Sequence, residues 1–192
     1  YPTNVGRYVV QAEVGRGSMS AVYRAYDPLF ERNVALKFLL PNLQNAQPVR
    51  ERFLQEARII AALDHPGIVP VYDFAEYDEF PYLVIRLMPN GSLSERLGQR
   101  GLSLLEMVRI INCLAPALDE AHRQGVVHRD LKPSNILFDQ RDMPFLSDFG
   151  IAKLIGRDKR LTNTGYLIGT PAYMSPEQIE GRQDLDCLLY TS

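Results

Sequence analysis

The residues with the clearest chemical potential lie in one short run and in a tripeptide that follows it. The run is Val127-His128-Arg129-Asp130-Leu131-Lys132-Pro133-Ser134-Asn135, and the tripeptide is Asp148-Phe149-Gly150. Transfer of a phosphoryl group from a nucleotide needs hard oxygen ligands for a metal ion, a carboxylate near the attacking hydroxyl and cations near the phosphates. Asn135 and Asp148 can hold a metal, Asp130 can orient a hydroxyl, and Lys132 can offset developing charge. The alternative is a polar loop without chemical meaning.

A lysine in an apolar strand is the second candidate. In an extended strand Lys37 shares one face with Ala35 and Leu39, and the residues on the opposite face are also apolar. A buried ammonium group needs a partner. Glu56 falls on the same helical stripe as Phe53 and Ile60 and can provide one. The alternative is that both charged side chains reach solvent separately.

A glycine-rich turn lies between two predicted strands, Gly15-Arg16-Gly17-Ser18-Met19-Ser20. Because strands flank it, it is not the strand-to-helix turn of a dinucleotide fold. Such a loop can lie over phosphates with its backbone N–H groups directed at them. Taken alone, the motif is weak, and a tight hairpin turn is the simpler explanation of the same residues.

The elements that must position these residues change character along the chain. The first part is rich in β-branched and aromatic runs with one helical stretch, which predicts an antiparallel sheet with a single inserted helix. The predicted strands are 8–14, 21–26, 33–40, 68–74 and 82–88, and the predicted helix begins at Pro48 and ends at Leu63.

The second part is helical. An apolar stripe predicts one long amphipathic helix that begins at Leu104, contains Pro116 and is closed by Gly125. The stripe consists of Leu104, Val108, Ile111, Ala115, Leu118 and His122. Two short apolar stretches follow at 135–138 and 144–147, so the chain reads as a β-rich half joined to a helical half.

Composition excludes several classes of protein. The chain has 192 residues, of which 46% are apolar and 23% charged, and a net charge of −2, as expected for one globular domain. No apolar run approaches the roughly 18 residues of a spanning helix, and no signal peptide is visible. The net charge gives no reason to expect nucleic acid. Cys113 and Cys187 lie far apart, which fits a reducing compartment.

Together these motifs resemble the eukaryotic-like Ser/Thr protein kinases, in particular their bacterial branch. The resemblance covers residues 7–183 and implies an α+β, bilobal fold, with an antiparallel N-lobe sheet and helix C in 7–88 and a partial helical C-lobe in 89–183. The matching motifs are the glycine-rich loop, Val34-Ala35-Leu36-Lys37, Glu56, His128-Arg129-Asp130, Asn135, Asp148-Phe149-Gly150 and Ser175-Pro176-Glu177.

The resemblance also implies roles for individual residues. Lys37, Glu56, Asp130 and Lys132 would be catalytic, and Asn135 and Asp148 would hold Mg²⁺, with Mn²⁺ as an alternative ion. Ser20 replaces the usual third glycine of the loop and leaves the Gly15 and Gly17 amides available for ATP. The ATP site would comprise Val14, Gly15, Arg16, Gly17, Ser18, Val22, Ala35, Lys37, Ile85, Leu87, Met88 and Leu137.

Regulation and partners follow from the same resemblance. Arg129 would grip a phosphate in the activation segment, which predicts autophosphorylation at Thr162 and Thr164. The partners would be ATP, protein substrates with Ser or Thr, and a second copy of the chain for autophosphorylation. The catalytic domain would lie in the cytoplasm, with the parent protein anchored to a membrane through a part beyond this chain.

The last residues depart from the family. A kinase continues after Ser175-Pro176-Glu177 into further helices that would cover the stripe of the long helix, and 184–192 does not match them. We therefore expect a C-terminally truncated domain with 184–192 as a tail, and both a genuine and a non-native origin stay open for 187–192. The predicted function is Ser/Thr protein kinase. The alternative is a truncated remnant that binds nucleotide or a partner without transfer, and a small-molecule phosphotransferase fits the activation segment less well.

Overall fold

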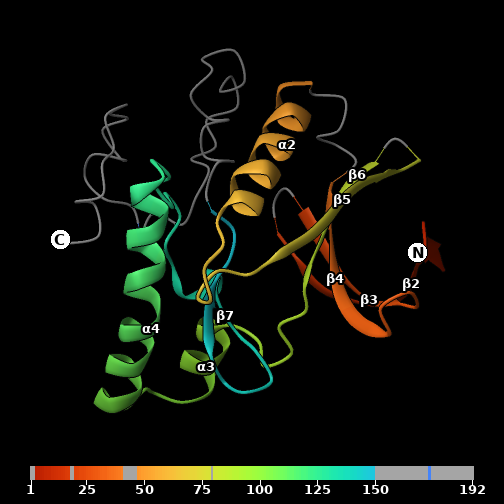
Figure 1. Cartoon of the computed structure of the whole chain (residues 1–192). Coiled ribbons are helices and arrows are strands. Elements are labelled where there is room, and N and C mark those ends of the chain that lie inside the picture. Colours follow the sequence, from red (N-terminus) through yellow and green to blue (C-terminus); the bar gives the residue numbers. More distant parts are fainter. Residues whose placement is uncertain (1–2, 18–19, 41–46, 79, 150–172, 174–192) are drawn as a thin grey trace, which may run out of the picture. The chain divides into compact units, whose positions relative to one another are not determined.

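A computed structural model describes residues 3–17, 20–40, 47–78, 80–149 and 173, with only the backbone of 47–49, 52 and 56 (Figure 1). Contacts divide the chain into two units. The first unit holds residues 1–64 and 69–89, and the second holds 65–68 and 90–192. In the described part, no helix has the length and apolar character needed to cross a lipid bilayer.

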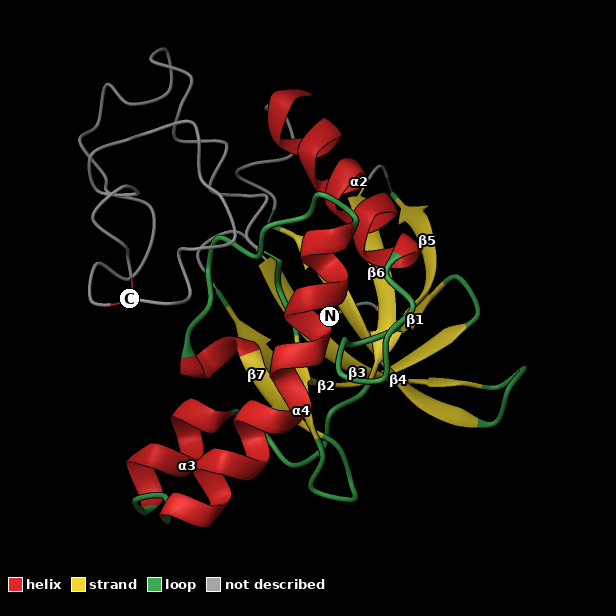
Figure 2. Ribbon diagram, turned by 60° about the vertical axis from the view of Figure 1, so that its left-hand side comes forward, coloured by secondary structure: helices red, strands yellow, loops and turns green. Residues whose placement is uncertain are grey.

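The first unit is built on a six-stranded antiparallel sheet with strand order β1-β2-β3-β4-β6-β5. Its strands are rich in the β-branched and aromatic residues that suit a pleated surface. Helix α2 (Gln47–Ala62) lies beside β5 (Figure 2) and buries Phe53, Ala57 and Ile60, as the helical stripe predicts. The strands are β1 (Asn4–Val5), β2 (Tyr8–Arg16), β3 (Ser20–Asp27), β4 (Arg32–Leu39), β5 (Val71–Tyr77) and β6 (Phe80–Arg86).

Strand β4 is buried on both of its faces, as predicted. On one face Val34 and Leu36 are fully buried in an apolar cluster that also contains Tyr8 and Tyr82. On the other face Ala35 is 4% exposed and Lys37 is 9% exposed. The sheet therefore places an ammonium group within an interior strand.

The second unit contains α3 (Leu93–Gln99), α4 (Leu104–Arg123), the 3₁₀ turn η1 (Pro133–Asn135), and the antiparallel strands β7 (Ile136–Phe138) and β8 (Pro144–Leu146). Both α-helices begin with a reciprocal cap, in which a serine hydroxyl accepts from a backbone N–H and a glutamate accepts from the N–H of that serine. The pairs are Ser92 with Glu95 and Ser103 with Glu106. Helix α4 packs against β8, which leads to the candidate site.

The face of α4 that packs is not the predicted apolar stripe. Leu104 is 74% exposed and Ile111 is 62% exposed, whereas Leu114, Ala117 and Ala121 are buried. The reason is close approach: a Cβ atom added to Gly67 would lie 3.0 Å from the Cβ of Ala117. Small residues let the loop and the helix backbone meet on this face, whereas the exposed stripe is the one that further kinase helices are expected, from the sequence, to cover.

Most predicted elements are present, and the differences have local causes. Gly125 follows α4 with a φ of 73°, as predicted for its end. Strand β5 begins at Val71 instead of Ile68. Pro70, just before it, has no N–H to donate, and its carbonyl accepts from the N–H of Arg86 at 3.1 Å. Ile68 instead forms an isolated bridge with Leu146 in the second unit. Strand β1, helix α3 and turn η1 were not predicted.

Candidate active site

The first unit aligns several predicted ATP residues by strand register. Val22 pairs with Lys37 across β3 and β4, Gly15 pairs with Val22, and Ile85 pairs with Ala35. Residues directly opposite each other in a sheet share a face, as do residues two apart in one strand. All five of these residues therefore lie on one face of the sheet, opposite the face that carries Val34 and Leu36.

The glycine-rich turn differs from its prediction in one respect. The N–H of Gly17 donates to the carbonyl of Ser20 at 2.8 Å and so closes the hairpin. The Gly17 amide is therefore engaged within the turn, and the expectation that it is available is wrong for this conformation. Arg16 is held by Glu13 through two hydrogen bonds of 2.7 and 2.8 Å.

The other predicted ATP residues have less regular positions. Val14 lies at a register shift of β2 and is 53% exposed. Leu87 and Met88 follow β6 and are half-buried, and Leu137 is a half-buried residue of β7 in the second unit. Ser18 and the side chain of Glu56 lie outside the described residues, so the pairing of Lys37 with Glu56 stays a prediction.

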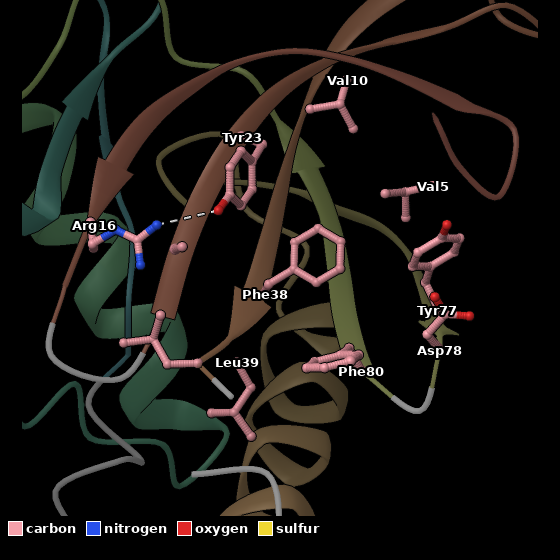
Figure 3. A pocket seen from close by; sticks show the side chains of 11 residues that line it. Val5, Val10, Arg16, Tyr23, Phe38, Leu39, Tyr77, Asp78 and Phe80 are labelled. Atoms are coloured by element: carbon pink, nitrogen blue, oxygen red, sulfur yellow. Dashed lines mark hydrogen bonds between the residues drawn. The ribbon is translucent and has the colours of Figure 1, made fainter. Parts of the chain in front are cut away.

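A cavity of about 400 Å³ in the first unit is not the predicted adenine site (Figure 3). Tyr23 and Phe38 line it with their side chains, and they project from the face that carries Val34 and Leu36. Only Arg16 belongs both to this cavity and to the predicted ATP residues. The full lining is Val5, Val10, Arg16, Ala21, Tyr23, Phe38, Leu39, Leu40, Tyr77, Asp78 and Phe80.

In the second unit, one loop brings together three of the predicted polar residues. The ammonium group of Lys132 lies 2.8 Å from a carboxylate oxygen of Asp130. The side-chain amide of Asn135 donates to the backbone carbonyl of Asp130 at 2.8 Å and to its carboxylate at 3.1 Å. The turn η1 makes this possible because it reverses the chain between Lys132 and Asn135. The result is an oriented carboxylate with a cation beside it.

Two residues at this site have left-handed backbone conformations. Arg129 has a φ of 61° and Asp148 a φ of 53°. Such conformations cost about 1 to 3 kcal/mol for residues other than glycine and persist where the surrounding contacts impose them. These backbone conformations occur at Arg129, predicted to be regulatory, and at Asp148, predicted to bind a metal. Thr162 and Thr164 lie outside the described residues.

His128 holds the loop from inside, a role that the sequence did not assign. Its side chain is fully buried, its Nε2 lies 2.9 Å from the carbonyl of Ser147, and its ring packs against that of Phe149 with the centroids 4.5 Å apart and the planes tilted by 37°. Burial lowers the pKa of His128 to about 4, so the ring is neutral near pH 7. A neutral ring donates from Nε2 to Ser147 and accepts at Nδ1 from the N–H of Asp130 at 3.3 Å. The signal in the sequence was a histidine directly ahead of Arg129 and Asp130.

The donor set fits Mg²⁺. Asn135 is 5% exposed, and since its amide nitrogen donates to Asp130, the amide oxygen is the atom that would serve as the predicted ligand. Asp148 supplies a carboxylate close enough to act electrostatically on His128. Among the residues that the structure describes, no cluster of three or more His, Cys, Asp or Glu could hold a metal alone. Magnesium typically takes one or two protein oxygens and completes its shell with phosphates and water, which matches this pair.

Comparison with known proteins places these features in a family. A profile of the protein kinase domain matches residues 8–186. The chain belongs to the protein kinase domain family. A DNA damage-responsive serine/threonine-protein kinase of Deinococcus radiodurans, RqkA, is 40% identical over 92% of the chain. The serine/threonine-protein kinase PknE of Mycobacterium tuberculosis is 40% identical over 98% of the chain.

Solved structures agree with this assignment. A variant of the Mycobacterium tuberculosis PknI kinase domain has a TM-score of 0.73 at 30% identity, covering 95% of this chain and 68% of that one. The apo form of PpkA-294 has a TM-score of 0.82 at 26% identity, covering 92% and 69%. The predicted family and the kinase-like α+β fold are therefore confirmed. The chain spans 27% of the length of RqkA and 35% of PknE.

Proposed function

We propose that this domain transfers the γ-phosphate of ATP to serine and threonine hydroxyls of proteins. The observation that carries the proposal is the loop in which Lys132 and Asn135 both contact the Asp130 carboxylate, at 2.8 and 3.1 Å. A carboxylate held from two sides can orient a hydroxyl and accept its proton as the phosphoryl group is transferred. The same polar groups together with Asp148 are compatible with a bound metal nucleotide.

Each half of the domain then has a task. On the sheet, Val22, Ala35 and Ile85 contact the adenine, the backbone at 87–88 pairs with its edge, and Lys37 with Glu56 holds the α- and β-phosphates. Val14, Arg16, Ser18 and Leu137 complete the nucleotide site. In the loop, Asp130 orients the substrate hydroxyl and Lys132 offsets negative charge. Asn135 and Asp148 would hold Mg²⁺ or Mn²⁺, and the ion neutralises the phosphates when bound.

The two glycines of the turn support a nucleotide at this face. Neither has a positive φ, and an added Cβ would lie 4.0 Å from Val22 at Gly15 and 3.8 Å from the Ser20 carbonyl at Gly17. The hairpin therefore does not itself require glycine at either position. Glycine does allow a ligand to approach the backbone closely.

The test compares phosphate transfer by the unsubstituted chain with transfer by Asp130→Asn. We expect a loss of about 10² to 10⁴-fold in kcat/KM, since a positioned base contributes that range, with little change in thermal unfolding. Asp119→Asn on the exposed face of α4 is the matched control and should keep full activity. Equal background transfer by both variants and the unsubstituted chain would overturn the proposal. ATP-dependent thermal stabilisation without transfer would identify a binding module instead.

We also propose that Arg129 grips a phosphate on Thr162 or Thr164. A phosphorylated threonine carries up to two negative charges and three acceptor oxygens, which an arginine can pair. Mass spectrometry after incubation with ATP and Mg²⁺ should find both threonines modified. Finding both unmodified while a protein substrate is phosphorylated would contradict this proposal.

Autophosphorylation between two copies is the proposed route to the phosphorylated state. If one copy modifies another, the initial rate per molecule rises with protein concentration, whereas modification within one molecule is independent of protein concentration.

The cytoplasm is the proposed location of this domain, with anchoring to a membrane in the whole protein. Fractionation of source cells with an antibody to this domain tests the location. Recovery of the whole protein in the soluble fraction alone would contradict anchoring.

A further inference from the structure

Ser147 makes an unusual double contact with a predicted metal ligand. It follows β8 directly, is 8% exposed, and donates twice to the same atom. Its backbone N–H donates to the carbonyl oxygen of Asn135 at 2.9 Å, and its hydroxyl donates to that oxygen at 3.1 Å. One backbone carbonyl oxygen thus accepts two hydrogen bonds from one residue.

The other end of Ser147 is tied to the catalytic loop. Its carbonyl accepts from Nε2 of His128 at 2.9 Å, and His128 in turn accepts from the N–H of Asp130. Asn135 is linked back to Asp130 through its side-chain amide. Ser147 therefore closes a ring of hydrogen bonds that passes through His128, Asp130 and Asn135 and lies next to Asp148.

The hydroxyl is not needed to satisfy the Asn135 carbonyl, because the backbone N–H already does so. A buried carbonyl with one good hydrogen bond has little left to lose, so removal of the second bond costs little folding free energy. What the second bond adds is restriction: a second donor limits the rotation of the peptide group that follows the Asn135 side chain. The effect should appear in the site that Asn135 serves.

We propose that the Ser147 hydroxyl is a positioning group that holds Asn135 in the orientation required for metal binding. This inference rests on the proposed function, since Asn135 is assigned there as a ligand of Mg²⁺. The hydroxyl acts through Asn135, to whose carbonyl it donates. Its loss therefore weakens the response to metal while the fold and the nucleotide face of the first unit stay unchanged.

The experiment compares Ser147→Ala, Ser147→Thr and the control Ser94→Ala, which removes an exposed hydroxyl from α3. At saturating ATP, the free Mg²⁺ concentration for half-maximal transfer should rise about three- to tenfold in Ser147→Ala, the range expected for one hydrogen bond. Ser147→Thr keeps the hydroxyl and should restore the original value. Independently of activity, Mn²⁺ with ADP should bind more weakly to Ser147→Ala by the same factor in electron paramagnetic resonance titrations.

Three outcomes would overturn the inference. An unchanged metal requirement in Ser147→Ala, with the unsubstituted chain active, would overturn the role of Ser147 and leave the proposed function intact. A lowered unfolding temperature with unchanged Mn²⁺ binding would reduce Ser147 to a structural residue. An unsubstituted chain that neither transfers phosphate nor binds Mn²⁺ with ADP would overturn both proposals.

Discussion

The two units hold their candidate residues by different physical means. In the first unit, Val22, Ala35 and Lys37 share a face because strand pairing aligns them, and the hydrogen bonds involved are between backbones. In the second unit, Asp130 and Asn135 are held by side chains in a loop with left-handed residues. The first unit relies on regular backbone pairing between strands, and the second relies on an irregular network of side-chain hydrogen bonds.

This difference determines what a substitution does. A sheet keeps its register when one side chain changes, because the ladder of backbone bonds and the remaining side chains still specify it. A loop network has no such reserve, since each buried polar group depends on a particular partner. Loss of a sheet side chain should therefore remove function alone, while loss of a buried loop group that is the single partner of another, such as His128, should lower stability as well.

The largest expected effect is the loss of stability in His128→Ala. The substitution leaves a cavity beside Phe149 and removes the donor to the Ser147 carbonyl, which together should cost about 3 to 5 kcal/mol. Urea denaturation measures the change directly. A cost below about 1 kcal/mol would show that the loop does not depend on its buried histidine and would break the comparison.

The counterpart in the sheet is Lys37→Met. Methionine fills a similar volume and leaves the pairing of β4 with β3 and β6 intact, so the unfolding free energy should change by less than it does in His128→Ala. Transfer should fall about 100-fold or more, since removal of one charge-stabilising donor costs roughly 10² to 10³ in kcat. Steady-state kinetics beside urea denaturation checks both parts. A strongly destabilised but proportionally active variant would contradict it.

The regular half is also the half that the sequence revealed best. Alternation along β4 predicted that Ala35 and Lys37 share a buried face, and helical spacing predicted the inward side of α2. These predictions succeed because the periods of strands and helices translate directly into faces. The family motifs named the polar residues of the loop but contained no geometry for them.

The sequence was less informative where contacts between distant segments decide the outcome. The exposed apolar stripe of α4 has the same helical spacing as a buried one. The face that packs is instead the one with Ala117, which lies close to Gly67, a residue distant in the sequence. Likewise, nothing near His128 or Ser147 in the sequence predicts that they bond to each other. Such tertiary contacts follow from the assembled fold and not from a local period.

A smaller expected effect is the pH dependence of stability that comes from His128. The pKa of histidine in the unfolded chain is about 6.5, whereas burial lowers the pKa of His128 in the folded protein to about 4. The stability that depends on the neutral ring is therefore fully present above pH 6.5 and is lost as the pH falls toward 4. Between pH 7 and 5 the unfolding free energy should fall by about 2 kcal/mol from this group.

The measurement is urea denaturation at several pH values with His128→Gln as the reference, because glutamine can donate to Ser147 but does not titrate. The variant should lack this part of the pH dependence. Identical slopes for the two proteins would mean that His128 is not the buried neutral group described above. The sheet contributes no comparable histidine, so the difference belongs to the loop.

The smallest expected change in stability is that of Gly17→Ala in the hairpin turn. The added Cβ has ordinary space and the φ of Gly17 is not positive, so the unfolding free energy should change by less than about 1 kcal/mol. The KM for ATP should nevertheless rise several-fold, because a methyl group above the sheet face obstructs the nucleotide. Gly91→Ala is the contrasting control: its φ of 69° and the contact of a Cβ with Glu95 predict clear destabilisation with little effect on KM. If Gly17→Ala instead lowers stability and leaves KM unchanged, the turn is glycine-rich for the hairpin and not for a ligand, and the functional interpretation of this face rests on the strand residues, Lys37 among them.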